Sequence, residues 1–149
     1  MRVVVVAGLP GSGKSTWLRQ FARDVLSSDD IRTELTGDPG DQSANARVFS
    51  LLRARLAERL AAGIQVTYID ATNLNRRERR PFILAARSAK ARAEAVWFDT
   101  PRDVCQARNR DRGRQVPAHV IDAMAARFIP PSEAEGFDAV EMIPPQTEA

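Results

Sequence analysis

The sequence predicts an α/β fold in three layers, a parallel five-stranded sheet with helices on both faces. Two observations support this prediction. Short apolar runs of strand length alternate along the whole chain with segments whose apolar residues recur at helical spacing. The first of these runs, residues 3–7, is continuously β-branched or small, which is typical of a strand buried on both faces of a sheet.

The first half of the chain is expected to contain two strands, each followed by a helix. A glycine-rich turn after residues 3–7 leads into residues 14–24, whose apolar side chains fall on one helix face. Residues 25–28 are expected to form a short second strand. The helix that follows is also short and covers residues 30–35.

The second half continues the alternation. A long helix over residues 43–62 keeps one apolar stripe and ends before Gly63, the usual residue type beyond a helix C-terminus. Pro130 and Pro131 are expected to end the last helix. The remaining strands are expected at 66–70, 93–98 and 137–143, and the remaining helices at 77–92, 99–109 and 117–128.

Length and composition favour one domain over residues 1–149, with a tail from about residue 144 that frays. Cys105 is the only cysteine, so no disulfide can form within the chain, and a cytoplasmic location is expected. No apolar run approaches the roughly 20 residues that a membrane span needs. Lys14 and Lys90 are the only lysines among 22 basic residues, and arginine binds phosphate in bidentate fashion where lysine acts as a point charge.

The turn after the first strand carries the most specific motif of the sequence. Gly8, Gly13, Lys14 and Ser15 meet the spacing Gly-x4-Gly-Lys-Ser of a P-loop. In this motif backbone N–H groups surround the phosphates, the lysine reaches the β- and γ-phosphates and the serine hydroxyl binds Mg²⁺. We therefore expect ATP and Mg²⁺ as cofactors, because the Asn-Lys-x-Asp motif that reads guanine is absent. The expected nucleotide-binding residues are Gly8, Leu9, Pro10, Gly11, Ser12, Gly13, Lys14, Ser15 and Thr16, with Lys14 also catalytic.

Carboxylates follow the other strands at the edge where the ligands of parallel sheets bind. Asp29 follows the second strand, Asp70 ends the third and Asp99 follows the fourth. Asp29 is a candidate general base for an alcohol that attacks the γ-phosphate, and Arg32, one helical turn later, could hold an acceptor phosphate. The alternative is that Asp29 or Asp30 only caps the helix. Asp70 is expected to hold Mg²⁺ through water, or else to form a turn.

Two arginine clusters remain. Residues 108–117 begin with arginines at alternate positions and include a glycine, as expected of a lid that closes over a triphosphate and supplies cations. The alternative for this segment is a solvated basic helix end. Residues 76–80 carry arginine at every position except Glu78. They indicate either a nucleic-acid-binding patch or a solvated first helical turn.

Taken together, these motifs resemble one family, the 5′-polynucleotide kinases of bacteriophage and bacterial RNA-repair systems, in their kinase domain. The resemblance covers about residues 3–140. It rests on the P-loop, on Asp29-Asp30-Ile31-Arg32, on Asp70-Ala71-Thr72-Asn73-Leu74-Asn75, on Phe98-Asp99-Thr100-Pro101 and above all on Arg108-Asn109-Arg110-x-Arg112-Gly113 followed by Val116-Pro117.

This resemblance implies roles for individual residues. Asp29 would activate the 5′-hydroxyl of a nucleic acid and Arg32 would hold the neighbouring 3′-phosphate. Arg112 would contact the transferring phosphate and Arg108 the donor nucleotide. Asp70 and Asn73 would position either the water molecules bound to the metal or the acceptor. Residues 130–133 would border the adenine. One departure is that residues 35–47, in the expected acceptor region, include no aromatic residue that could stack a base.

Two other functions use the same motifs. A kinase of a small-molecule alcohol, such as a sugar acid, an antibiotic, a nucleotide sugar or an aminoacylated RNA, would have the same loop and the same carboxylate base. A P-loop ATPase or nucleotide-dependent switch would need the loop but not Asp29 paired with Arg32. The acceptor groove distinguishes the two kinases, because a polymer needs an open basic groove and a metabolite a closed polar one.

Overall fold

The computed structural model describes residues 1–112 and 116–145 and confirms the predicted α/β fold. Among these residues the strands form a five-stranded sheet in the order β2-β3-β1-β4-β5, and every neighbouring pair is parallel. The strands are β1 (Arg2–Ala7), β2 (Val25–Ser27), β3 (Val66–Asp70), β4 (Arg92–Phe98) and β5 (Ala139–Ile143). Residues 113–115 of the predicted lid and residues 146–149 of the predicted frayed tail lie outside the described residues.

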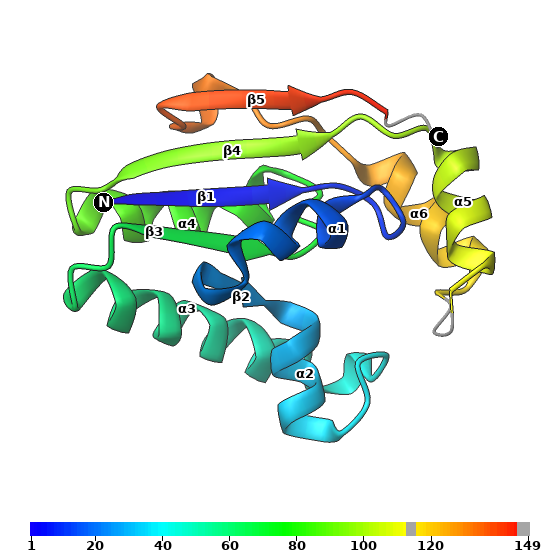
Figure 1. Ribbon diagram of the computed structural model, residues 1–149, viewed down its shortest axis with the longest axis horizontal. Helices are drawn as coiled ribbons and strands as arrows, with labels where there is room; N and C mark the ends of the chain where they lie inside the picture. Colours follow the sequence, from blue (N-terminus) through cyan, green and yellow to red (C-terminus); the bar gives the residue numbers. More distant parts are fainter. Residues whose placement is uncertain (113–115, 146–149) are drawn as a thin grey trace.

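The helices lie on both faces of the sheet and beyond its carboxyl edge (Figure 1). Helix α1 covers one face, α4 covers the other, and α5 and α6 lie where the strand arrows point. The helices are α1 (Lys14–Leu18), α2 (Ser28–Thr36), α3 (Asn45–Ala61), α4 (Arg76–Ser88), α5 (Arg102–Arg110) and α6 (Ala118–Arg127), with 3₁₀ turns at Arg19–Asp24, Gln42–Ala44 and Glu133–Glu135.

Alternation along β1 divides the core between the two faces of the sheet. Val3 and Val5 belong to the larger cluster, which contains the apolar stripe of α3 and the inward face of α4. Val4 and Val6 pack with Leu18 of α1 on the opposite face. Both faces of β1 are therefore covered, as its continuous β-branched run predicts.

A third, smaller apolar cluster fixes the two helices beyond the sheet edge. It joins Leu9 of the loop after β1, Leu74 of the loop after β3 and Cys105 of α5, with Met124 of α6 and Phe128 just after that helix packed against them. No helix among residues 1–112 and 116–145 is long and apolar enough to span a membrane.

The structure corrects several predicted helix bounds: the helix predicted over 77–92 ends at Ser88, with Arg92 already in β4, and the helix predicted over 99–109 begins only at Arg102. The predicted helix over 14–24 is α-helical only to Leu18 and continues as a 3₁₀ segment with non-helical dihedral angles at Phe21. The second helix begins at Ser28, two residues earlier than predicted, because the Ser27 hydroxyl accepts a hydrogen bond from the backbone N–H of Asp30 at 3.3 Å. Ser27 is therefore the cap, and Asp29 and Asp30 lie in the first turn with their carboxylates free of that role.

Candidate active site at the carboxyl edge of the sheet

A cleft of 1410 Å³ opens at the carboxyl edge of the sheet, where ligands of parallel α/β folds bind. The P-loop follows the central strand, so it lies in the middle of this cleft. On one side of the loop the cleft is lined by residues of α2 and of the start of α3, and on the other side by residues 141–144 at the end of β5; residues of α6 line it as well. The cleft brings together most of the predicted site residues: Leu9, Pro10, Gly11, Gly13, Lys14, Ser15, Thr16, Asp29, Arg32, Asp70, Arg108 and Arg112.

The P-loop backbone is closed tightly enough to require its glycines. A Cβ at Gly8 would lie 2.7 Å from the Ser12 hydroxyl, and one at Gly11 would lie 2.7 Å from the Cys105 carbonyl oxygen. Gly11 and Gly13 also have φ values of 83° and 107°, which disfavour other residues. The Ser12 hydroxyl is buried and has no hydrogen-bond partner among the described residues. These features fit a loop that binds phosphates through its backbone.

Lys14 is held at the centre of this loop. Its Nζ donates hydrogen bonds to the carbonyl oxygens of Gly8 at 2.8 Å and Leu9 at 3.4 Å. Burial lowers the pKa of Lys14, and the negative charges of Asp70 and Asp29 partly offset that effect. An anionic phosphate in the cleft would stabilise the charged ammonium further.

The groups expected to bind Mg²⁺ are Ser15, which is exposed at the start of α1, and Asp70, at the end of β3. Both line the cleft. Burial raises the pKa of Asp70, and the charge of Lys14 opposes this. Among the described residues no three His, Cys, Asp or Glu side chains gather into a metal site. The Ser15 hydroxyl and the Asp70 carboxylate are oxygen groups that fit Mg²⁺, which is usually held by one or two protein groups together with waters and substrate phosphates.

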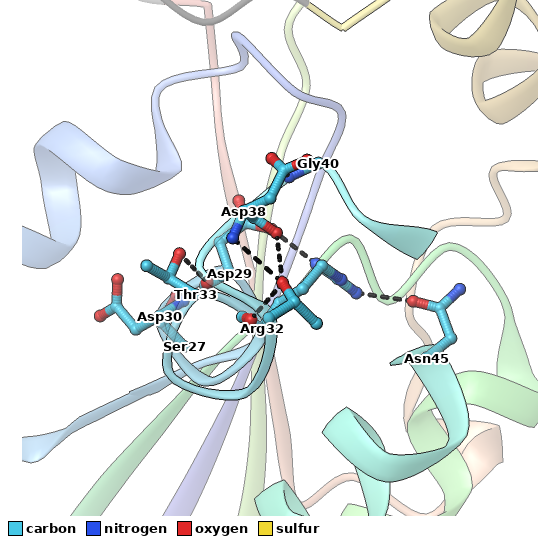
Figure 2. A network of polar contacts seen from close by, with 9 residues as sticks. Ser27, Asp29, Asp30, Arg32, Thr33, Asp38, Gly40 and Asn45 are labelled. Carbon is cyan, nitrogen blue, oxygen red and sulfur yellow. Dashed lines mark hydrogen bonds and ion pairs between the residues drawn. The ribbon is translucent and has the colours of Figure 1, made fainter. Parts of the chain in front are cut away.

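A polar network at the start of α2 holds the predicted base (Figure 2). Arg32 Nη1 donates to Asp29 Oδ1 at 2.9 Å, and Arg32 Nη2 donates to Asn45 Oδ1 at 2.7 Å. The Arg32 side chain is 5% exposed and that of Asp29 is 51% exposed. The buried guanidinium, anchored on α3, therefore orients a carboxylate that remains open to the cleft. Arg32 Nε is buried without a hydrogen-bond partner among the described residues.

Two of the residues predicted at strand ends do not reach the cleft. Asp99 is exposed, but it is not among the cleft-lining residues. Asn73 is 2% exposed, and its Nδ2 donates to the Val6 carbonyl oxygen at 2.8 Å. Its backbone has a φ of 48°, which asparagine tolerates better than most residues. This geometry supports the turn after β3, and a role of Asn73 in substrate binding stays a prediction.

At the predicted lid, Arg108 and Arg112 both line the cleft. Arg108 Nη1 donates to the Gly11 carbonyl oxygen at 3.3 Å, which places it against the P-loop. Asn109 is 4% exposed, and its Oδ1 accepts from Arg112 Nη2 at 3.0 Å and from the Val116 backbone N–H at 2.9 Å. The Asn109 amide also donates to the Val116 carbonyl oxygen at 2.5 Å. Asn109 thus joins the two described ends of the lid, which the sequence motif contains without revealing this role.

The arginine cluster at the start of α4 is split by burial. Arg79 is 0% exposed and pairs with Glu135 through Nε–Oε1 and Nη2–Oε2 distances of 2.8 and 3.0 Å. Its Nη1 donates to the carbonyl oxygens of Asn73 and Ile129, both at 2.8 Å. Neither predicted reading of the cluster applies to Arg79, which instead ties the loop after β3 to the segment after α6.

Sequence reasoning missed several cleft-lining residues. Phe49 of α3 lies just beyond the segment 35–47 in which an aromatic was sought, and Val120 and Met124 of α6 line the same cleft. At the opposite end the cleft is lined by residues 141–144, whereas none of residues 130–133 lines it, contrary to the implied adenine contact. The sequence signal for Val120 and Met124 was their spacing of four residues on a predicted helix, but the same spacing is typical of two residues in the hydrophobic core.

The sheet order, the P-loop and the cleft define a protein of the P-loop kinase class. The sequence profile of the family described as AAA domain matches residues 3–131, and the chain belongs to that family.

Individual relatives share this class. The chain is 23% identical over 155 residues to the L-seryl-tRNA(Sec) kinase of Methanococcus maripaludis, covering 98% of this chain and 60% of that protein. It therefore spans less than two thirds of that curated relative. A gluconokinase from Sinorhizobium meliloti has a similar fold, with a TM-score of 0.67, 19% identity and coverage of 98% of this chain and 83% of that one. A chain of a Pnkp1/Rnl/Hen1 complex is 26% identical with a TM-score of 0.62, over 78% of this chain and 40% of that one.

Proposed function

We propose that the protein is an ATP-dependent kinase that transfers the γ-phosphate to an alcohol, and that this alcohol is the 5′-hydroxyl of a polynucleotide. The observation that carries the proposal is the Asp29–Arg32 pair, joined at 2.9 Å in the same cleft as the P-loop. A carboxylate that accepts a proton and a cation beside it are what an attacking alcohol with a neighbouring phosphate needs.

In the proposed reaction the part of the cleft at the P-loop, the donor end, holds ATP. The part around α2 and the start of α3, the acceptor end, holds the alcohol. The backbone of residues 8–15 and Lys14 hold the triphosphate, while Ser15 and Asp70 hold Mg²⁺ directly and through water. When bound, the metal neutralises charge on the transferring phosphate. Asp29 accepts the proton of the acceptor hydroxyl as its oxygen bonds to the γ-phosphorus and the bond to the β-phosphate oxygen breaks. Arg112 and Lys14 offset the charge on the phosphate in transit.

Support for a nucleic-acid acceptor comes from two sources. A chain of the Pnkp1/Rnl/Hen1 complex matches 78% of this chain at 26% sequence identity. Among the described residues, the basic side chains that line the cleft are Lys14, Arg19, Arg32, Arg108, Arg112 and Arg127, against the carboxylates of Asp29, Asp70, Glu78 and Glu141. This excess of positive charge suits a polyanion.

The second candidate is a kinase of a small-molecule alcohol or an aminoacylated RNA. The extent of the similarities favours it, because the L-seryl-tRNA(Sec) kinase and the gluconokinase each match 98% of this chain. Both candidates assign Asp29 the same task and differ in what the rest of the cleft must bind.

One assay separates the candidates. The protein is incubated with γ-labelled ATP and Mg²⁺, together with 5′-hydroxyl RNA, 5′-hydroxyl DNA, a seryl-tRNA or a panel of small alcohols that includes gluconate. We expect label on the 5′-end of an oligonucleotide. Label only on a small alcohol, or only on the seryl group of the seryl-tRNA, would replace the first candidate with the second, and ATP hydrolysis that no acceptor changes would refute both.

A further inference from the structure

The first two turns of α3 line the cleft next to the Asp29–Arg32 pair. Asn45 and Phe49 are four residues apart on this helix, so their side chains lie on one face, and both line the cleft. The neighbouring face of α3 is core, since Val48 and Leu52 are both 0% exposed. Phe49 lies at the border between the core and the cleft.

The Phe49 ring is only partly used by the core. It is a partly buried residue that packs against the larger apolar cluster, and it also lines the cleft. Asn45, one turn earlier, accepts the hydrogen bond from Arg32 at 2.7 Å. An aromatic ring therefore lies one helical turn from the side chain that anchors Arg32.

Other apolar side chains line the same cleft, although Leu74 and Met124 belong to a different apolar cluster from Phe49. Val120 and Met124, four residues apart on α6, line it together with Leu74 after β3. An acceptor that is hydroxylated on all sides would leave these groups unmatched. A nucleotide supplies a hydroxyl for Asp29, a phosphate for Arg32 and a flat base for the apolar part.

We propose that Phe49 determines acceptor specificity by stacking the base of the nucleotide that carries the reacting hydroxyl. This inference rests on the proposed function and extends it from the reacting group to the adjoining base. Stacking of a base on an aromatic side chain tolerates any sequence, because every base has a π-face. Recognition at this position should therefore depend on the presence of a base and little on its identity.

The test compares two 5′-hydroxyl oligonucleotides that differ only in their first nucleotide, which carries adenine in one and is abasic in the other. The wild-type protein should use the first with a kcat/KM about tenfold higher or more. Phe49→Leu, which keeps most of the apolar volume, should reduce that preference to about twofold or less. Phe49→Tyr should retain it, and the KM for ATP should change little in either variant.

Phe82→Leu is the matched control, because Phe82 is 2% exposed in the same core cluster but does not line the cleft. It should lower the midpoint of thermal unfolding and leave the preference unchanged. Equal use of both oligonucleotides by the wild-type protein would overturn the inference while leaving the proposed function in place, as would a full preference in Phe49→Leu. Phosphorylation of neither oligonucleotide would overturn both.

Discussion

The donor and acceptor parts of the cleft are built in different ways. The donor end is one contiguous segment, in which the glycines of the P-loop and Lys14 are positioned by backbone turns and by hydrogen bonds within residues 8–14, and Thr72, Thr100 and Arg108 bond to this segment from outside. The acceptor end is assembled from separate elements, with Asp29 and Arg32 on α2 and Asn45 on α3. A phosphate common to all nucleotides can be bound by a fixed local motif, whereas an acceptor is recognised by side chains that the tertiary fold must bring together.

This comparison predicts that substitutions at the two ends change different kinetic constants. Donor-end variants should change the use of ATP whatever the acceptor is, and acceptor-end variants should change the use of the acceptor at constant ATP affinity. The four predictions below test that separation, beginning with the largest expected effect.

Asp29→Ala should lower kcat by about 10²- to 10⁴-fold, the usual contribution of a general base. Binding of ATP should remain close to that of the wild-type protein, because the Asp29 carboxylate is half-exposed and is paired with Arg32 of its own helix. Phosphoryl transfer to an oligonucleotide and equilibrium binding of a fluorescent ATP analogue are the two measurements. Full activity in this variant would refute the assignment of the base.

Lys14→Met should lower kcat by about 10²- to 10³-fold, as expected when one preorganised donor to the transferring phosphate is removed. The loss should be equal for every acceptor, in contrast to acceptor-end variants. Steady-state rates with two different acceptors provide the comparison. A loss confined to one acceptor would contradict the assignment of Lys14 to the donor end.

Arg32→Lys should raise the acceptor KM by about tenfold, because a single ammonium cannot reproduce the fork that holds Asp29 and Asn45 together. The KM for ATP should change little. Arg55→Lys is the matched control, since Arg55 also joins α3 to α2, through Glu34 at 2.6 Å, without lining the cleft. An unchanged acceptor KM in Arg32→Lys, or an equal rise in Arg55→Lys, would count against the role of Arg32.

Asn109→Ala should lower kcat by several-fold, because it frees Arg112 and the Val116 backbone from their shared partner. Asn109→Asp retains an acceptor for Arg112 and should recover part of the loss. Since Arg112 acts on the phosphate in transit, the acceptor KM should stay within about twofold of the wild-type value. An effect on thermal stability without a change in kcat would make Asn109 a structural residue only.

The sequence determined the fold class and the donor end, because the signals for both are local. Strand and helix periodicities lie within single segments, and the P-loop spacing of Gly8, Gly13 and Lys14 is contiguous. Asp29 and Arg32 could be paired from their spacing of one helical turn, and the structure joins them at 2.9 Å.

Tertiary structure decided what depends on residues distant in sequence. It buries Arg79 against Glu135. The sequence around Arg79 could not reveal this pairing, because Glu135 comes 56 residues later. It brings Asn45 to Arg32 and turns Phe49 toward the cleft, which requires α3 to pack beside α2. It commits Asn73 to the Val6 carbonyl, 67 residues earlier. Local patterns record the conformation of one segment, whereas burial and partners depend on which segments meet.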